Sequence, residues 1–378
     1  MRNVLLHFAA GLLATAMVWP TTAYALETSA REAVVIDHAT GTELFEKNAH
    51  ESMPPASMTK IMTAYMVFER LKDGRLSLDD TFLISKKAWQ KGGSKMFIEV
   101  GREIRVGDLL RGVIIQSGND ASIALAEGIA GSEAAFAEMM TEKARELGLE
   151  NTTFKNATGW PHPEHRTTAA ELAEISRQLI QRFPEYYHYF AEREFTWNDI
   201  RQFNRNPLLR RNIGVDGLKT GHTQNAGYGL TASAEREGRR VTVVVNGLQT
   251  PRQRASEAAR LLQWGFREFE SYTFFEAGET VETAPVWLGE AERVPLVVDE
   301  SLSMVVKREA REDMTVKVIY ESPIPAPIEK GDALATLRIE VPGQETREAV
   351  LKAGAAIPQK GPLGRVVSGV EFLLFGAP

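Results

Sequence analysis

The chain has 378 residues, of which 43% are hydrophobic and 25% charged, a balance typical of globular domains with enough apolar material for a core. Its 44 basic and 50 acidic residues give a formal net charge of −6, and no lysine–arginine cluster dominates a segment, which argues against a nucleic-acid partner. The absence of cysteine excludes disulfides, thiolate metal sites and cysteine nucleophiles.

Residues 1–25 have the pattern of a secretory signal peptide. Arg2 supplies a positive charge, residues 4–18 form an apolar core, and Ala23-Tyr24-Ala25 has the small-x-small pattern that signal peptidase accepts. The core is too short and too rich in alanine and glycine to favour a permanent membrane span, although a retained anchor is the alternative. We therefore expect an exported protein.

Alternating and helical patterns follow one another along residues 26–275. Two alternating runs joined at Ala39-Thr40-Gly41 predict a β-hairpin over residues 33–49. A second pair of strands is predicted over residues 228–248. Helical spacing predicts helices over residues 57–71, 106–130, 132–149, 169–183 and 256–269. Strands at both ends with helices between them predict one antiparallel sheet packed with helices, an α+β fold.

From about Glu276 the pattern changes to short alternating strands separated by turn residues. They are expected at residues 294–299, 302–307, 314–320, 333–341 and 347–353. This pattern predicts a small all-β sandwich or barrel domain over residues 276–358.

The last segment, residues 359–378, has the pattern of an amphipathic helix. Pro362 suits a first helical position. One face collects the apolar residues Leu363, Val366, Val367, Val370, Leu373 and Leu374. Such a helix could lie in a membrane interface or dock on the protein's own surface, and both alternatives stay open here.

Ser57 and Lys60 stand one helical turn apart at the start of the first predicted helix. A serine in this place is commonly a helix N-cap, and a Ser-x-x-Lys pair is expected by chance about once in a chain of this length. The same two residues could instead form a nucleophile with a lysine base. The pair alone does not decide between these interpretations.

Two further motifs favour the second interpretation. Ser117-Gly118-Asn119 falls at a predicted helix end, and Lys219-Thr220-Gly221 enters a predicted strand. Ser-Gly-Asn by itself is typical of ordinary turns. The ordered set of Ser-x-x-Lys, a Ser-x-Asn element and Lys-Thr-Gly is, however, the signature of penicillin-binding proteins and class A β-lactamases. In an exported protein the complete set is a strong indication of serine acyl transfer.

Over nearly the whole mature chain the sequence resembles the serine-type D-Ala-D-Ala carboxypeptidases, the low-molecular-mass penicillin-binding proteins. The segments that carry the resemblance are DHATGTEL, PPASMTKIMTAY, SGNDASIALAE, VDGLKTGHT and the WGF of a late helix. The resemblance implies a β-lactamase/penicillin-binding-protein-like catalytic domain over residues 26–275. It also implies peptidoglycan stem peptides and β-lactams as ligands, no cofactor, and a periplasmic or cell-envelope location. Peripheral contact of residues 359–378 with the membrane surface stays one of the two alternatives for that segment.

The resemblance also implies catalytic roles. Ser57 would attack, and Lys60 would act as general base, because burial and the charge of Lys219 lower its pKa. Ser117 would relay a proton to the departing amine. Asn119 would hold the substrate amide and the Lys60 side chain.

Substrate binding is expected along the Lys219 strand, which would pair with the substrate as with an added β-strand. Lys219 would grip the terminal carboxylate together with the hydroxyls of Thr220 and Thr223. Gly221 would leave room for close approach of the substrate backbone.

The resemblance implies three further positions around the site. The backbone N–H groups of Ser57 and His222 would form the oxyanion hole. Arg254 matches a family arginine that helps to bind the carboxylate. Arg205 is a further candidate, as a residue that braces the site.

The predicted activity is removal of the terminal D-Ala from stem pentapeptides. A D,D-endopeptidase, a β-lactamase and a non-catalytic wall-binding scaffold remain as alternatives, although no Glu-x-x-Leu-Asn segment lies between Asn119 and Lys219 to supply a lactamase base. Residues 91–101 depart from the family's loop beside the site, which leaves substrate preference open. His162 and His165 lie among prolines that deny them a shared helical face, which argues against zinc.

Overall fold

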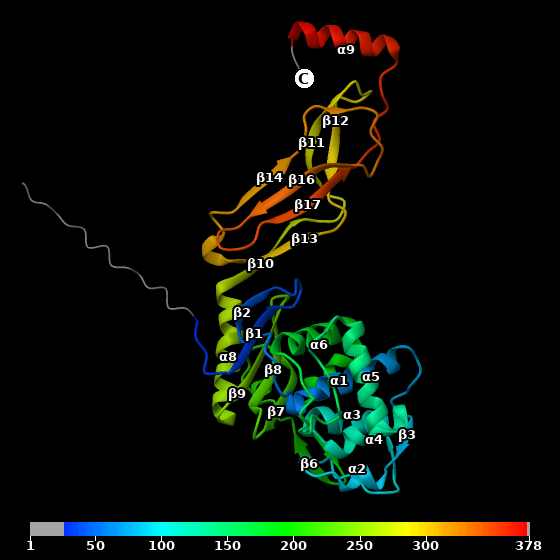
Figure 1. The fold of residues 1–378 in the computed structure, drawn as a ribbon, viewed down its shortest axis with the longest axis vertical. Coiled ribbons are helices and arrows are strands. Elements are labelled where there is room, and N and C mark those ends of the chain that lie inside the picture. The colour runs from blue at the N-terminus through cyan, green and yellow to red at the C-terminus, as the bar shows by residue number, and fades with distance from the viewer. Residues whose placement is uncertain (1–25, 376–378) are drawn as a thin grey trace, which may run out of the picture.

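The structure, a computed structural model, describes residues 26–375, so the predicted signal peptide lies outside the described part. Figure 1 shows an α+β body at one end, a β-rich region beyond it, and helix α9 at the far end. The predicted fold class, an α+β domain followed by a smaller all-β domain, is confirmed.

The α+β body is built on one antiparallel sheet with the strand order β2-β1-β9-β8-β7. Its strands are β1 (Glu32–Asp37), β2 (Glu43–Lys47), β7 (Val215–Thr223), β8 (Gly227–Arg236) and β9 (Arg239–Leu248). Alternation buries both faces: Val34 and Ile36 join one apolar cluster, whereas Ala33 and Val35 join another. Strand β7, which carries Lys-Thr-Gly, lies at an edge of the sheet and therefore offers its outer side to an added strand.

Helices cover both faces of this sheet. The larger ones are α1 (Lys60–Lys72), α3 (Val106–Arg111), α4 (Asn119–Ala130), α5 (Glu133–Glu146), α6 (Ala169–Arg182) and α8 (Pro251–Glu268), and the short ones are α2 (Lys86–Gln90) and α7 (Pro184–Tyr187). Helix α8 packs against β8 and β9, and α6 packs against β1 and β9. The Thr250 side chain caps α8 by accepting a hydrogen bond from the backbone N–H of Gln253.

One predicted helix is interrupted. The run expected over residues 106–130 consists of α3, a π-helical turn η2 (Gly112–Gln116) and α4. Ser117 ends the π turn with φ of 66°, a left-handed conformation that stops the helix and reverses the chain before Asn119. Apolar periodicity is similar on both sides of the break, so the pattern alone does not reveal it.

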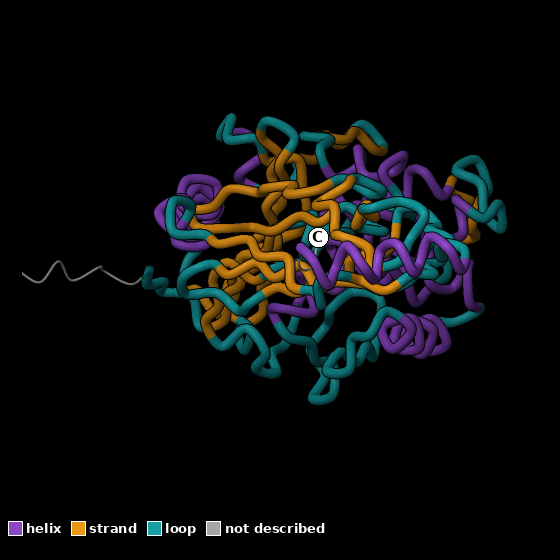
Figure 2. The backbone as a smooth tube through the Cα atoms, turned by 90° about the horizontal axis from the view of Figure 1, so that it is seen from above, coloured by secondary structure: helices purple, strands orange, loops and turns teal. Residues whose placement is uncertain are grey.

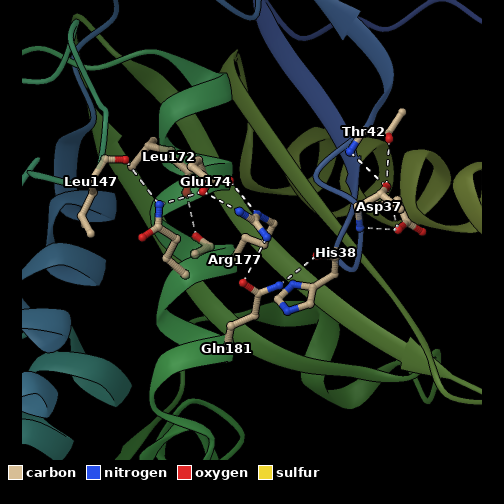
Figure 3. A network of polar contacts seen from close by, with 11 residues as sticks. Asp37, His38, Thr42, Leu147, Leu172, Glu174, Arg177 and Gln181 are labelled. Atoms are coloured by element: carbon tan, nitrogen blue, oxygen red, sulfur yellow. Dashed lines mark hydrogen bonds and ion pairs between the residues drawn. The ribbon is translucent and has the colours of Figure 1, made fainter. Parts of the chain in front are cut away.

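Polar contacts join the β1–β2 connection to α6 (Figure 3). Gln181 Nε2 donates to the backbone oxygen of His38 at 3.3 Å, and Gln181 Oε1 accepts from Arg177 at 3.0 Å. Arg177 Nε in turn pairs with Glu174 at 2.6 Å. Burial lowers the pKa of His38 to about 4, so this histidine is neutral at pH 7. The contacts hold α6 in place where it packs on the sheet.

Two hairpins of short strands were not predicted. They pair β3 (Thr81–Leu83) with β4 (Glu103–Arg105), and β5 (Glu194–Trp197) with β6 (Ile200–Phe203). Strands of three or four residues carry too little alternation for a sequence pattern to detect.

The β-rich region has a six-stranded sheet in the order β14-β16-β17-β12-β11-β15 and a two-stranded sheet, β10-β13. The strands are β10 (Phe269–Phe275), β11 (Thr280–Trp287), β12 (Arg293–Val297), β13 (Leu302–Lys307), β14 (Thr315–Ile319), β15 (Ile324–Pro325), β16 (Ala333–Glu340) and β17 (Arg347–Ala353). Its own core includes Leu296, Leu337 and Leu351. Strand β10, which falls among the residues assigned to the first domain from sequence, pairs with β13 of this region.

Helix α9 (Pro362–Phe375) begins at the predicted proline. Figure 2, seen along the long axis, shows it lying crosswise at the end of the molecule. Leu363 is 85% exposed and Val366 66% exposed, so this face does not dock on the protein's own surface. The side chains of Leu373 and Leu374 lie outside the described part. Within residues 26–375, no helix combines the length and apolar character needed to cross a membrane.

Candidate active site

Ser57 lies in a 3₁₀ turn, η1 (Ala56–Thr59), that leads directly into α1. Ala56 has φ of 48°, a left-handed conformation that costs free energy for a non-glycine residue and is typical of functional sites. Ser57 Oγ accepts a hydrogen bond from Lys60 Nζ at 3.2 Å, and no side chain of this turn caps a helix. The helix-cap interpretation of Ser57 therefore does not hold.

Two glycines let other segments approach this turn closely. A Cβ atom on Gly159, where φ is +79°, would lie 1.8 Å from the Ala56 carbonyl oxygen. A Cβ atom on Gly221 would lie 2.9 Å from the Pro55 carbonyl oxygen. The sequence-based interpretation reserved Gly221 for a substrate backbone, but its nearest neighbour is the serine turn itself.

The Lys60 amine is completely buried and reaches three oxygen atoms. Nζ donates to Ser57 Oγ, to Asn119 Oδ1 at 2.8 Å and to the Thr158 carbonyl at 2.6 Å. Burial is the main reason why the pKa of Lys60 is lowered to about 7, and Arg205 is the next. Near neutral pH a large fraction of this lysine is therefore uncharged while it contacts the serine hydroxyl.

Lys219 brings a second buried amine from strand β7. Its Nζ donates to the Thr220 carbonyl at 3.2 Å. Burial lowers its pKa well below the usual value, and the charges of Lys60, Arg205 and Arg254 lower it further. The sequence predicted that the charge of Lys219 lowers the pKa of Lys60. Among the cations, however, Arg205 lowers the pKa of Lys60 most. The repulsion between the two lysines appears instead in the lowered pKa of Lys219.

Ser117 and Asn119 lie at the break between the π turn and α4, and Asn119 is the one whose side chain contacts Lys60 and lines the cleft among the described residues. Ser117 is 3% exposed in its left-handed conformation. Asn119 is the first residue of α4, and it accepts from Lys60 while its Nδ2 donates to the Gly92 carbonyl at 2.9 Å. One amide thus joins Lys60 to the loop of residues 91–101.

Arg205 is presented by a loop that two asparagines hold in place. Asn204 Nδ2 donates to the Glu192 carbonyl at 2.9 Å, and Asn206 Nδ2 donates to the Gly217 carbonyl at 2.8 Å. The second bond ties the loop to β7, which explains how residues of FNRN come to lie beside Lys219.

Arg254 projects from the first turns of α8 toward Tyr228. Its guanidinium lies 5.7 Å from the Tyr228 ring centroid, and that ring stacks on His222 with centroids 3.9 Å apart. Arg254 Nε is buried and has no hydrogen-bond partner, which leaves a donor free for a ligand. Among the described residues, no aspartate or glutamate pairs with Lys219, Arg205 or Arg254, so this end of the site favours an anion.

A cleft of about 500 Å³ opens over Ser57. It is lined by Ser57, Asn119, Thr158, Trp160, His222 and Thr223 together with short polar stretches of residues 93–94 and 224–225. Thr223 also fixes the end of β7, since its hydroxyl accepts from the Ala226 N–H at 3.0 Å. The cleft thus collects predicted residues from three distant segments: Ser57, Asn119, and His222 with Thr223. Lys60, Ser117 and Lys219 are buried and are not part of its lining.

Comparison with known proteins agrees with this geometry. Residues 19–250 match the family model described as D-alanyl-D-alanine carboxypeptidase, and residues 269–359 match the penicillin-binding protein 5 C-terminal domain. The chain belongs to the D-alanyl-D-alanine carboxypeptidase family. This confirms the resemblance identified from the sequence motifs.

Relatives within this family cover most of the chain. The Escherichia coli K12 carboxypeptidase DacC is 40% identical over 360 residues, which is 93% of this chain and 90% of DacC. Bacillus subtilis DacF is 37% identical and covers 88% of this chain and 87% of its own. The structure of penicillin-binding protein 5 from Haemophilus influenzae superposes with a TM-score of 0.80 at 34% identity, covering 89% of this chain and 99% of that one.

One solved relative contains a β-lactam. Penicillin-binding protein D2 from Listeria monocytogenes, solved in its cefotaxime-bound form, has a TM-score of 0.59 at 32% identity. The match covers 64% of this chain and 99% of that one. It therefore extends over a part of the present chain that is comparable in length to the α+β body.

Some residues that shape this carboxypeptidase-family site were not found from sequence. Asp120 is buried and accepts from the backbone N–H groups of Met96 at 2.8 Å and Phe97 at 2.9 Å. It thereby anchors the loop of residues 91–101. The only available signal was its place directly after Asn119, in a stretch whose composition also suits an ordinary turn.

A second residue that was not predicted, Asn156, shapes the turn that presents the Thr158 carbonyl to Lys60. Asn156 Oδ1 accepts from the N–H groups of Gly159 at 2.8 Å and Trp160 at 3.0 Å, which turns the chain back on itself. His165, considered from sequence only as a metal ligand, is buried, and its Nε2 lies 2.9 Å from Thr59 Oγ1. This histidine braces the serine turn.

Proposed function

We propose that this protein is a serine-type D-Ala-D-Ala carboxypeptidase that removes the terminal D-Ala from peptidoglycan stem pentapeptides. One observation carries the proposal: a buried lysine amine with a pKa of about 7 lies 3.2 Å from the hydroxyl of Ser57. Family membership and the relatives named D-alanyl-D-alanine carboxypeptidase support the same reaction.

In the acylation step, neutral Lys60 takes the proton of Ser57 as Oγ attacks the carbonyl carbon of the penultimate D-Ala. The backbone N–H groups of Ser57 and His222 stabilise the oxyanion. As the C–N bond breaks, the proton that Lys60 took from Ser57 passes through the Ser117 hydroxyl to the departing amine. Water then hydrolyses the ester on Ser57 and regenerates the free enzyme.

Binding is directed by the cationic end of the site. The terminal carboxylate lies against Lys219 and Arg254, with Thr220 and Thr223 as hydroxyl donors. The peptide pairs with the free edge of β7, while Asn119 holds its amide. Arg205 assists through its charge, which also lowers the pKa of Lys60.

β-Lactams fit the same groups because they carry a reactive amide and a carboxylate, and the cefotaxime complex of the Listeria relative supports this assignment. Efficient β-lactamase activity is disfavoured, since no aspartate or glutamate lines the described cleft to activate a deacylating water. An endopeptidase activity on cross-linked peptides would use the same residues. A non-catalytic scaffold would not need a neutral lysine beside the serine.

Incubation with labelled penicillin followed by intact-protein mass spectrometry and peptide mapping tests the proposal. We expect one equivalent of label, located on Ser57, and release of D-Ala from a peptide ending in D-Ala-D-Ala. An adduct on another residue, or rapid multiple turnover of the antibiotic without D-Ala release, would contradict it.

Replacing Arg254 with glutamine should lower kcat/KM for a peptide with a free terminal carboxylate by about 10- to 100-fold, because a charge-assisted contact is lost. Turnover of the same peptide with an amidated C-terminus, which lacks the carboxylate, should change little in this variant. Arg252→Gln, an exposed position on the same helix, is the matched control. Equal losses with both substrates would show that Arg254 does not contact the carboxylate.

We also propose a location and an arrangement of domains. The chain is exported to the periplasm or cell envelope, and the apolar face of α9 contacts the outer surface of the cytoplasmic membrane. Residues 276–358 form the domain that separates this helix from the catalytic domain of residues 26–275. The exposure of Leu363, Val366, Val367 and Val370 and the position of α9 at the far end in Figure 1 support this arrangement.

A further inference from the structure

The cleft over Ser57 continues into a second hollow, here called the outer chamber. The outer chamber has a volume of about 300 Å³ and is lined by Pro55, Trp160, Pro161, Arg166, Thr223 and Asn225 among others. Trp160, Pro161, Thr223 and Asn225 also line the cleft that contains Ser57. The two spaces therefore adjoin at this shared wall and are together called the groove.

In the proposed function the upstream part of the substrate points toward the outer chamber. In the proposed function the terminal carboxylate lies at Lys219 and Arg254, and the peptide follows the edge of β7. Strand β7 (Val215–Thr223) ends four residues after Lys219, and its last residue, Thr223, lines both spaces. Residues before the terminal D-Ala-D-Ala, which extend beyond the carboxylate contact, therefore lie toward the outer chamber.

The walls of this groove are cationic or neutral although the chain as a whole carries a formal charge of −6. No aspartate or glutamate lines either space among the described residues. Lys91 Nζ lies 4.1 Å from the Trp160 ring centroid. The acidic residue of the same loop, Glu164, already pairs with Lys155 at 3.1 Å.

Arg166 is the charged side chain within the outer chamber. Its Nε donates to the Pro163 carbonyl at 2.9 Å, which orients the guanidinium. Within the described residues, no carboxylate pairs with Arg166, so both terminal nitrogen atoms keep their donors for a ligand. A guanidinium of this kind, held at one nitrogen and open at the others, suits two-point binding of a carboxylate.

We propose that the outer chamber is a subsite for a carboxylate carried by the substrate peptide upstream of D-Ala-D-Ala, with Arg166 as its cation. Trp160 forms the wall against which the aliphatic part of that residue packs. This inference rests on the proposed function and extends it, because it makes an acidic upstream residue the preferred substrate class. Arg166 acts in binding and leaves the chemistry at Ser57 unchanged.

The test uses peptides that end in D-Ala-D-Ala and carry one glutamate at the first, second or third preceding position, each with a glutamine counterpart. At one position we expect the wild-type enzyme to favour glutamate about tenfold in kcat/KM, the value of one partly exposed charge-assisted contact. Arg166→Gln should reduce this ratio to about one, and Arg166→Glu should reverse it. The glutamine peptides give the reference rate of each variant, so that the ratio reports the carboxylate alone.

Arg211→Gln, which removes an exposed arginine away from both spaces, is the matched control and should keep the preference. The rate of Ser57 acylation by penicillin, together with thermal unfolding, reports that each variant is folded and active. A preference that persists in Arg166→Gln, or a wild-type enzyme without any preference, would overturn the inference while the carboxypeptidase activity stands. Absence of both D-Ala release and acylation would instead contradict the proposed function.

Discussion

Replacement of Ser57 by alanine is expected to reduce D-Ala release by at least about 10⁴-fold, because removal of a catalytic nucleophile typically costs up to about 10⁶-fold in rate. The substitution deletes one hydroxyl, which accepts a hydrogen bond from Lys60. The fold should therefore be retained. Steady-state release of D-Ala and intact-protein mass spectrometry after incubation with penicillin measure the effect.

Ser94→Ala is the matched control for this experiment. Ser94 lines the same cleft, and its backbone oxygen, which the substitution keeps, accepts from the Asn119 N–H at 2.8 Å. This variant should form the adduct at nearly the wild-type rate. If Ser57→Ala still bound penicillin covalently, the nucleophile would have to be another residue.

The second large effect concerns the proton on Lys60. Its pKa is lowered to about 7, so Lys60 is protonated below that pH and cannot accept the Ser57 proton. The acylation rate constant should consequently fall about tenfold per pH unit below pH 7 and level off above it. Penicillin acylation measured from pH 5.5 to 9 gives this profile.

Two substitutions separate charge from basicity at this position. Lys60→Arg keeps a cation that stays protonated at all accessible pH values, and Lys60→Met keeps a similar length without a base. Both should lower acylation by about 10²- to 10⁴-fold, the usual contribution of general base catalysis. An arginine variant with near wild-type activity, or a flat pH profile from 6 to 8, would show that another group takes the proton.

Lys143→Met provides a control of the same chemical change outside the cleft. Lys143 is on α5, where it pairs with Glu69 at 2.9 Å. Its loss should affect stability by no more than about 1 kcal/mol, the usual range for a partly exposed ion pair. The pH profile of acylation should keep its midpoint near 7 in this variant.

Much of the architecture could be predicted from sequence because periodicity is a local property. The hairpin at Ala39-Thr40-Gly41, the strands about residues 228–248 and the helix beginning at Pro362 all lie where their patterns predicted. Strands β10 and β11 were missed. Strand β10 pairs with β13, with β11 and β12 between them in the chain, so no local hairpin pattern marks it. Strand β11 does form a hairpin with the next strand, β12, but it contains Pro285, which a strand pattern disfavours.

The candidate site could likewise be predicted only in part. Three short motifs identify Ser57, Lys60, Ser117, Asn119 and Lys219, since the reaction requires particular residue types in a particular order. The left-handed turn at Ser117 and the role of Asp120 depend on how the loop of residues 91–101 packs, so no local pattern predicts them.

The amino-acid sequence alone thus determined the fold class, the family and the residue types proposed for the chemistry. Only the tertiary structure decided that Lys60 has a pKa near 7, that Arg205 is its leading cationic neighbour, and that Arg166 lines the hollow beside the Ser57 cleft. The physical reason is that burial and electrostatic interaction depend on distances between residues far apart in the chain. Those distances exist only once β7, α1 and the loop before α6 have packed together.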